Sequence, residues 1–322
     1  MASGLTHILL TKKLQDNLPE TRLKNIFAAG SDFLLVGAVG PDLPYASVAD
    51  HYFFSDESEL ADKFHYKKTN QIPLRALQEL KSRNGNMEEM AHFYMFSFFM
   101  GYISHVVADG IIHPFVRDKV GNYAENKAEH RCLEMQLDVL FMEDFTKETG
   151  YTLELNYTNL HDELSNIKDY KESAVIVTLF SELIEQVYHE RHSSKTILEW
   201  INGLHRLFEV AEGEHPKFYR VLEANTFFFK NRADINRDRA ILLGKPKDRD
   251  SNFLNVDQIS FFDHCVPRYF QTFIPLAQKA YAYVYEDGPE LTEEDIPSIN
   301  LDTGRLLAHD DLNVTPRFWQ NN

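Results

Sequence analysis

The amino-acid sequence predicts an all-α fold, built as a single multi-helix domain of 322 residues. Nearly every periodic segment repeats its apolar residues at the three- and four-residue spacing of an α-helix. No internal repeat or low-complexity tract interrupts the pattern. A chain of this length can bury a large core. We therefore expect helices packed around one core.

The amino-terminal part is predicted to contain two short helices. The first spans about residues 6–15, with Thr6 as its N-cap and His7 near its start. The second spans residues 21–29 and ends at Gly30. The apolar stretch that follows turns abruptly into Gly-Pro-Asp-Leu-Pro, which holds Asp42 on a restricted loop.

Residues 46–64 lack a clear period, and we interpret them as a loop that contains His51. His65 follows this loop and leads into a helix predicted at residues 73–83. The sequence Asn84-Gly-Asn then marks a turn.

The long helix predicted over residues 87–113 carries a set of polar residues that needs an explanation. His105, Asp109 and His113 follow one another at intervals of four. Each interval rotates only about 40° around a helix, so the three side chains line one stripe. The surrounding positions are Ile, Val and Ala, which indicates that the stripe is buried. His92, in the same helix, is interpreted as structural.

A second set follows on the next predicted helix, where His130, Glu134 and Asp138 again lie four residues apart. Two helices that present six nitrogen and oxygen ligands toward each other form a typical site for Zn²⁺ and similar metals. One such pair alone is more typical of a satisfied polar contact or a solvated helix face. Two sets so close in sequence favour a metal site.

The carboxyl-terminal part is also predicted to be helical. A short extended piece is expected near residues 151–160, and helices are expected at residues 171–190, 195–211, 215–230 and 257–285. The tail from Asp287 is expected to lie over the surface. The His-Asp doublets at His161 and His309 lie outside apolar helices, and we do not assign them to a metal site.

Charge and composition narrow the function. The net charge of −16 argues against a general nucleic-acid-binding protein, because phosphate backbones attract clustered Lys and Arg. Cys132 and Cys265 are too few for a disulfide framework. No signal peptide and no uninterrupted apolar stretch of transmembrane length is visible. We expect a soluble protein, cytoplasmic or exported without a classical signal peptide.

These elements together resemble the zinc-dependent phospholipase C family, which includes the catalytic domain of glycosylphosphatidylinositol-specific phospholipase D and is related to the P1-type nucleases. The matching elements follow the family's order. They are Thr-His at His7, Gly-Pro-Asp at Asp42, a following histidine, the segment Gly101 to His113, and His130-x-x-x-Glu134. We expect one domain, with the metal-site half at about residues 1–145 and a helical extension at about 146–322.

The resemblance also implies how zinc is held. One ion is expected to be bound by Asp42, His65, His105 and Asp109, and a second by His113, His130 and Glu134. Asp109 is expected to bridge to a third ion that His7 also binds. Asp138 is expected to lie behind the ligands and to orient one of them or a water. Asp42 is also the candidate catalytic base.

His51 and His65 both follow Asp42, and the pattern favours His65 as the zinc ligand. His65 precedes an amphipathic helix, as the ligand histidine does in the phospholipase D-like branch of the family. A helix start holds a side chain more firmly than a loop does, and zinc ligands must be held closely. We expect His51 to lie at the lip of the site.

The number of ions and the head group are less constrained. In the family, the terminal amine and carbonyl of a tryptophan complete the third site, whereas here Met1 or Ala2 precedes His7 by a few residues. We therefore expect two or three zinc ions. Choline-binding members have a tyrosine after the loop aspartate, where this chain has Leu43. The aromatic residues near the proposed ligands are candidates for cleft wall or core: Tyr45, Tyr52, Phe53, Phe54, Phe64 and Tyr66.

The resemblance implies a zinc-dependent phosphoric diester hydrolase acting on a phospholipid or a related small phosphodiester. Zinc lowers the pKa of bound water from about 16 to about 7 and offsets charge on phosphate oxygens. Contact with a membrane surface is expected to be transient. One alternative is a P1-type single-strand nuclease or nucleotidase. Another is a non-catalytic helical protein with a structural metal site.

Overall fold

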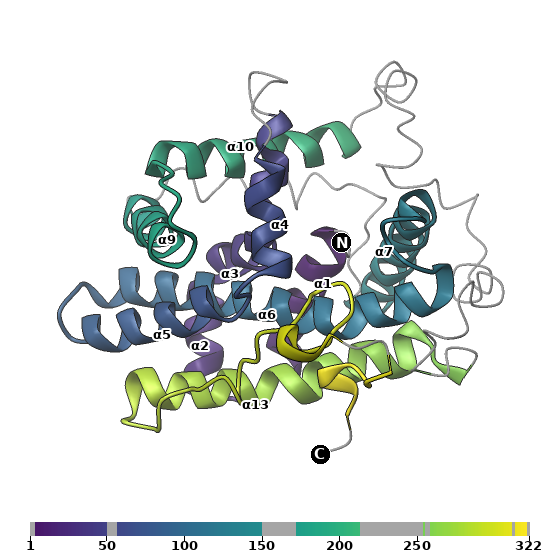
Figure 1. Cartoon of the computed structure of the whole chain (residues 1–322). Coiled ribbons are helices and arrows are strands. Elements are labelled where there is room, and N and C mark those ends of the chain that lie inside the picture. The colour runs from purple at the N-terminus through teal and green to yellow at the C-terminus, as the bar shows by residue number, and fades with distance from the viewer. Residues whose placement is uncertain are drawn as a thin grey trace.

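The long helix α6, Glu89–Val120, lies at the centre of the fold (Figure 1). Its sequence is apolar on all sides, and every residue from Met95 to Val120 is buried. The carboxylate of Glu88 caps its start, and the helix ends at Gly121, whose φ is 90°. The helix continues beyond the predicted end at residue 113 and passes through Pro114, because packing on all sides outweighs the loss of one backbone hydrogen bond.

A computed structural model describes residues 4–49, 57–149, 172–212, 254, 258–310 and 313–320. These residues form helices and no strand apart from one isolated bridge, which confirms the predicted all-α fold. The elements around α6 are α1 (Gly4–Asn17), α2 (Arg22–Ala29), α3 (Ser31–Ala38), η1 (Gly40–Ala49), α4 (Ser58–Tyr66), α5 (Gln71–Arg83), α7 (Lys127–Thr149), α9 (Glu172–Tyr188), α10 (Ser194–Glu212), η7 (Phe261–Cys265), α13 (Val266–Tyr285), η8 (Leu307–His309) and η9 (Arg317–Trp319).

Two glycines allow α3 to lie directly against α6. A Cβ on Gly37 would lie 2.0 Å from the Phe98 carbonyl oxygen, and a Cβ on Gly101 would lie 2.2 Å from the Leu34 carbonyl oxygen. Backbone atoms cannot move aside as a flexible side chain can. The two helices therefore cross at a distance that only glycine permits, and this crossing places the end of α3 beside the histidines of α6.

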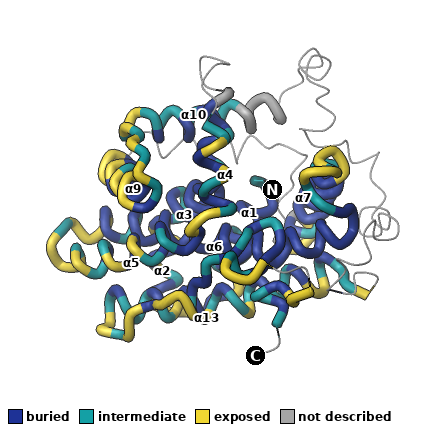
Figure 2. Tube along the Cα trace, viewed as in Figure 1, coloured by how far each residue is buried: buried dark blue, intermediate teal, exposed yellow. Residues whose placement is uncertain are grey.

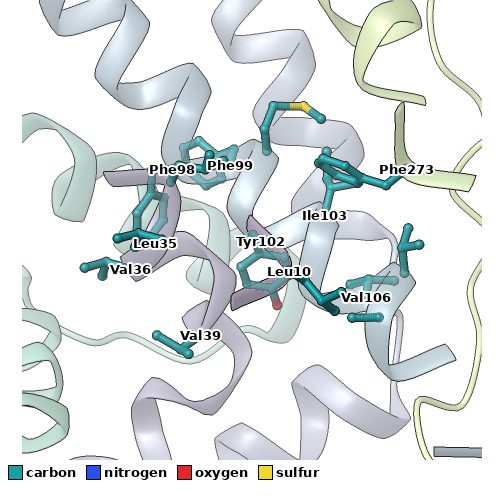
Figure 3. Packing of buried hydrophobic residues seen from close by; sticks show 14 of the residues in the cluster. Leu10, Leu35, Val36, Val39, Phe98, Phe99, Tyr102, Ile103, Val106 and Phe273 are labelled. Carbon is teal, nitrogen blue, oxygen red and sulfur yellow. The ribbon is translucent and has the colours of Figure 1, made fainter. Parts of the chain in front are cut away.

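The core is one continuous cluster of buried apolar side chains. Figure 3 shows Leu10 of α1, Leu35 of α3, Tyr102 of α6 and Phe273 of α13 in one packed group. The burial pattern agrees, since α6 is buried from Met95 onward while α9 and α13 expose one face (Figure 2). Buried residues on both sides of residue 145 belong to this cluster. The predicted division of the domain near residue 145 stays a prediction.

Two boundaries near the amino end differ from the sequence prediction. The first helix begins at Gly4, so Thr6 lies inside it and is not its N-cap. The second helix agrees closely: Thr21 caps it by accepting a hydrogen bond from the Lys24 amide, and it ends at Gly30. The Gly-Pro-Asp segment is a 3₁₀ helix, η1, rather than an irregular loop.

The prediction of a loop over residues 46–64 is wrong for the part that the structure describes. Helix α4 occupies Ser58–Tyr66 and buries Leu60, Ala61, Phe64 and His65 on one face. This pattern is amphipathic but only nine residues long, and charged residues between the apolar ones hide its period. His65 consequently lies in the last turn of α4, not at the start of the following helix. His51 lies outside the described residues.

The later helices are found where the sequence predicts them, with one change. Helices α9 and α10 match the predictions at 171–190 and 195–211. The segment predicted at 257–285 begins as a short π-helix, η7, and continues as α13. The expected helix at 215–230 and the extended piece near 151–160 lie outside the described residues.

The tail after α13 packs against α6 more deeply than expected. Ile299 and Leu301 are fully buried, and the Trp319 indole nitrogen donates to the Ile111 carbonyl oxygen at 3.0 Å. The Leu301 amide donates to the His65 carbonyl oxygen at 3.0 Å. The predicted surface position is therefore wrong for these buried residues, while others such as Glu290 and Glu294 are exposed. The few apolar residues of the tail are spaced without a helical period, so the sequence does not indicate their burial.

Helix α6 is also long and apolar enough to cross a membrane, a property that the sequence analysis did not expect. The most apolar stretch of this helix is wholly buried inside the protein. The core helix of a globular protein has the same composition, so length and composition alone do not identify a membrane span.

Candidate metal centre

Asp109 lies at the centre of the site, on α6, with four histidines around its carboxylate. Its Oδ1 is 3.2 Å from His7 Nε2 and 3.4 Å from His113 Nε2. Its Oδ2 is 3.1 Å from His105 Nε2 and 3.7 Å from His65 Nε2. The structure therefore brings residues of α1, α4 and α6 to one buried carboxylate.

Backbone carbonyls fix the orientation of two of these imidazoles. His65 Nδ1 is 2.7 Å from the Ala61 carbonyl oxygen, one turn earlier in α4. His105 Nδ1 is 2.9 Å from the carbonyl oxygen of Ala38, at the end of α3. A carbonyl only accepts, so each ring must donate its Nδ1–H. Nε2 of each ring then faces the centre of the cluster, as the ligand nitrogen does in metal-binding histidines.

The second predicted set lies partly at the same centre. Glu134 Oε1 is 3.9 Å from His113 Nε2, and Arg131 lies 3.6 Å from the other Glu134 oxygen. His130 donates from Nε2 to the Gly121 carbonyl oxygen at 2.6 Å, which leaves Nδ1 as its free ring position. Helix α7 thus adds the Glu134 carboxylate close to His113, while the His130 ring is held at the end of α6 by Gly121.

Asp138 contacts the segment that carries His7, and its predicted role behind the ligands stays a prediction. Its Oδ1 accepts hydrogen bonds from the Thr6 amide at 3.0 Å and from the Thr6 hydroxyl at 2.5 Å. It therefore anchors the start of α1, beside His7. Of the six residues on these two helices, four lie close together, namely His105, Asp109, His113 and Glu134. Other elements supply His7, His65 and Asp42.

His7 is fully buried and lies flat against His105. The two ring centroids are 3.9 Å apart and the ring planes differ by 11°. This stacking places His7 Nε2 beside Asp109, although His7 comes from a helix near the start of the chain.

Asp42 reaches the cluster from η1. Its Oδ1 is 3.3 Å from His65 Nε2, and its side chain is 14% exposed. Burial alone would raise the pKa of Asp42, but the charge interactions with His105 and His65 outweigh burial and lower the pKa to about 2. The group is therefore ionised at neutral pH. Helix α10 holds η1 in place, since Gly203 packs against the backbone of Ala46.

The electrostatics of the buried groups suit a cation. Burial raises the pKa of Glu134, and burial lowers the pKa of His130 to about 4 and the pKa of His113 well below its ordinary value. For Asp109, burial is outweighed by His113 and His105, which hold its pKa well below the usual range. Imidazole nitrogens and carboxylate oxygens crowded into a low-dielectric interior favour binding of a divalent ion.

The donor atoms fit a zinc centre. Several buried atoms make no hydrogen bond of acceptable geometry within the described residues: Asp42 Oδ1, His65 Nε2, His105 Nε2 and both oxygens of Asp109. Two groups of three residues, His7, Asp42, His105 and His65, His105, Asp109, have ligand atoms within 4.8 Å of one another. Ligands about 2.1 Å from a tetrahedral zinc ion lie about 3.4 Å from each other. The distances from the Asp109 carboxylate oxygens to the Nε2 atoms of the four histidines are 3.1 to 3.7 Å, which matches this spacing.

The aromatic candidates divide between the site and the core. The Tyr45 hydroxyl donates to Asp62 at 2.6 Å, and the rings of Tyr45 and Tyr66 lie 5.8 and 6.2 Å from the His65 ring. Phe64 instead is fully buried among core residues. Tyr52, Phe53 and Phe54 lie outside the described residues.

Sequence reasoning missed Asp302. Its Oδ1 lies 4.0 Å from His113 Nδ1, although it comes from the tail. The segment Asn300-Leu-Asp-Thr-Gly has no helical period and no second ligand at metal-binding spacing. Nothing in the sequence therefore placed Asp302 near the cluster.

An all-α fold with buried histidines and carboxylates converging on one aspartate defines a helical protein with a candidate metal centre. The family model for zinc-dependent phospholipase C matches residues 6–208, which is more than half of the chain. The chain therefore belongs to the zinc-dependent phospholipase C family, as the resemblance predicted. Comparisons with curated proteins and with solved structures gave no match.

Proposed function

We propose that the protein hydrolyses a phosphodiester bond of a phospholipid or a related small phosphodiester at the cluster around Asp109. Membership of the family supports a zinc-dependent phospholipase C type of hydrolysis and a lipid substrate. The observation that carries the proposal is the convergence of four imidazoles on the Asp109 carboxylate.

The two oxygens of Asp109 face different pairs of histidines. Oδ1 faces His7 and His113, and Oδ2 faces His65 and His105. This division supports Asp109 as a carboxylate shared between zinc ions. Bound zinc would supply a water activated near neutral pH and positive charge against the phosphate oxygens. The number of ions proposed is two or three.

Asp42 is proposed to act at the solvent side of the site. Its side chain is 14% exposed, whereas Asp109 is fully buried and the Glu134 side chain is 1% exposed. Among these three carboxylates, Asp42 is the one that solvent reaches. We infer that it binds zinc and accepts a hydrogen bond from the water that attacks phosphorus.

The charge of the chain supports a lipid rather than single-stranded nucleic acid. A nuclease needs a basic track for the phosphate backbone, and this chain carries a net charge of −16. Because the most apolar stretch of α6 is buried inside the protein, we propose a soluble protein whose contact with a lipid surface is transient.

Elemental analysis and side-by-side assays test the proposal. Purified protein should contain two to three zinc ions and should cleave phosphatidylcholine or phosphatidylinositol glycan in preference to single-stranded DNA. Asp109→Asn should lose zinc and cleavage together, whereas Asp16→Asn, an exposed substitution on α1, should keep both. A folded protein that takes up no zinc, or one that cleaves only DNA, would contradict the proposal.

The same site could instead be a structural metal site in a protein without catalysis, and one variant separates these possibilities. In an enzyme, His105→Ala should abolish turnover while leaving a weakened but folded protein. In a structural site, the same change should unfold the protein, as seen by circular dichroism.

A further inference from the structure

The tail that follows α13 lies beyond residue 208, where the family match ends, and it nevertheless reaches the metal centre. It brings Asp302 to within 4.0 Å of His113, measured from Oδ1 to Nδ1. The Asp302 side chain is 17% exposed, so its carboxylate is largely enclosed beside the ligand helices.

Two contacts with α4 and its following turn hold the tail at this place. The Leu301 amide donates to the carbonyl oxygen of His65, itself a proposed ligand, at 3.0 Å. Two residues earlier, the Ile299 amide donates to the Thr69 hydroxyl at 3.0 Å, and that hydroxyl donates to the Ile299 carbonyl oxygen at 2.8 Å. The position of Asp302 is thus tied directly to the backbone of the site.

A tight turn presents the Asp302 side chain. The Asn300 side-chain oxygen accepts hydrogen bonds from the amides of Asp302 at 2.9 Å and Thr303 at 3.4 Å. Gly304 has a φ of 66°, and a Cβ there would lie 2.6 Å from the Gly110 carbonyl oxygen of α6. Glycine therefore permits both the turn and its contact with α6, three residues before His113.

His113 uses its two ring nitrogens in opposite directions. Nε2 faces Asp109 at 3.4 Å and Glu134 at 3.9 Å, and Nδ1 faces Asp302. In His65 and His105 the nitrogen turned away from the centre lies against a backbone carbonyl. Metal-binding histidines commonly donate this second N–H to a carboxylate, a carbonyl or water, which fixes the ring and makes the ligand nitrogen more basic.

We propose that Asp302 is a positioning residue for His113, and that its carboxylate accepts the Nδ1–H hydrogen bond when zinc binds at Nε2. The present 4.0 Å exceeds hydrogen-bond distance. Contacts of this kind are often long before a site is filled and shorten when its ligand binds. The inference rests on the proposed function, because it takes His113 to be a zinc ligand.

Zinc affinity measured in competition with a chelator tests the inference on the full-length protein. Asp302→Ala should weaken zinc binding about 10- to 100-fold, the usual effect of losing such a partner, and Asp302→Asn should weaken it less, since an amide oxygen still accepts. The unfolding temperature of the zinc-free protein should stay near the wild-type value in both variants. Glu294→Gln, an exposed change in the same tail, is the control and should keep wild-type affinity.

The outcomes separate this inference from the function on which it rests. If the wild-type protein binds no zinc, both fail. If the wild-type protein binds zinc and Asp302→Ala binds it equally well, the role of Asp302 alone is refuted. If Asp302→Ala destabilises the zinc-free protein as much as the zinc-loaded one, Asp302 is only structural and the inference is likewise overturned.

Discussion

Thr6 and Asp138 are joined by two hydrogen bonds, one from the Thr6 amide at 3.0 Å and one from its hydroxyl at 2.5 Å, both to the same carboxylate oxygen. The two residues are 132 positions apart and belong to α1 and α7. Because His7 directly follows Thr6, this pair sets where His7 stands relative to Asp109.

We predict that Asp138→Ala destabilises the protein and depletes zinc. Two buried donors of Thr6 would lose a charged acceptor, and hydrogen bonds to charged groups contribute about 1.5 to 3 kcal/mol. The free energy of unfolding in urea should fall by about 2 to 4 kcal/mol. Elemental analysis should show less than the wild-type zinc content, because His7 is no longer held.

Asp16→Ala is the matched control, since Asp16 is an exposed carboxylate on the same helix. It should change the free energy of unfolding by no more than about 0.5 kcal/mol. Full zinc content in Asp138→Ala would show that Asp138 acts on the helix alone and not on the site.

His65 and His51 give a prediction about ligand identity. His65 Nε2 lies 3.3 Å from Asp42 and 3.7 Å from Asp109, so His65→Ala should lose zinc and turnover. His51→Ala, the paired variant, should retain zinc. Elemental analysis of both decides the question, and loss of metal with His51→Ala alone would reverse the assignment.

Gly37→Ala should separate α3 from α6. The added Cβ would meet the Phe98 carbonyl oxygen at 2.0 Å, and overpacking of a core costs about 1 to 3 kcal/mol, with more where backbone must move. We expect a loss of about 3 kcal/mol in denaturant unfolding and a lower zinc affinity, because Ala38, which orients His105, moves with α3.

Gly85→Ala serves as the comparison for this substitution. Gly85 has a φ of 77° and open space around it, so alanine there costs only about 1 to 2 kcal/mol of backbone strain. Its zinc affinity should equal that of the wild type. Equal losses of stability in the two variants would argue against the close crossing of α3 and α6.

His92 predicts a pH dependence of stability that is independent of the metal centre. Its ring contacts the Tyr285 hydroxyl and the Leu80 carbonyl oxygen, each at 2.8 Å. Burial lowers the pKa of His92 below its ordinary 6.5. At pH values between the lowered pKa and 6.5, the unfolded chain binds more protons at His92 than the folded protein does. The free energy of unfolding therefore rises with pH in this range and falls as the pH decreases through it.

In zinc-free protein, His92→Gln should flatten the fall of unfolding free energy below pH 6.5. The slope should decrease by at most ~1.4 kcal/mol per pH unit, the value for one proton. Exposed His309→Gln should leave the wild-type slope in place. An unchanged slope in His92→Gln would mean that His92 is protonated equally in both states.

Much of the fold was predictable because helical periodicity is a local property. The stripe of His105, Asp109 and His113 and the spacing of His130 and Glu134 follow from the geometry of single helices. The structure places His105, His113 and Glu134 together around Asp109. The sequence did not predict the short helix α4. Its nine residues contain too few turns to reveal a helical period among charged neighbours.

The sequence by itself determined the helical class, the buried stripe on α6 and the types of ligand available, because each depends on residues within a few turns of one another. Only the tertiary structure decided that Asp138 anchors Thr6, that His7 stacks on His105, and that Asp302 reaches His113. Those contacts join segments that are about one hundred residues or more apart in the sequence, so they depend on tertiary packing. Their positions are fixed by the shared core and by glycine-permitted close approaches, which no local pattern records.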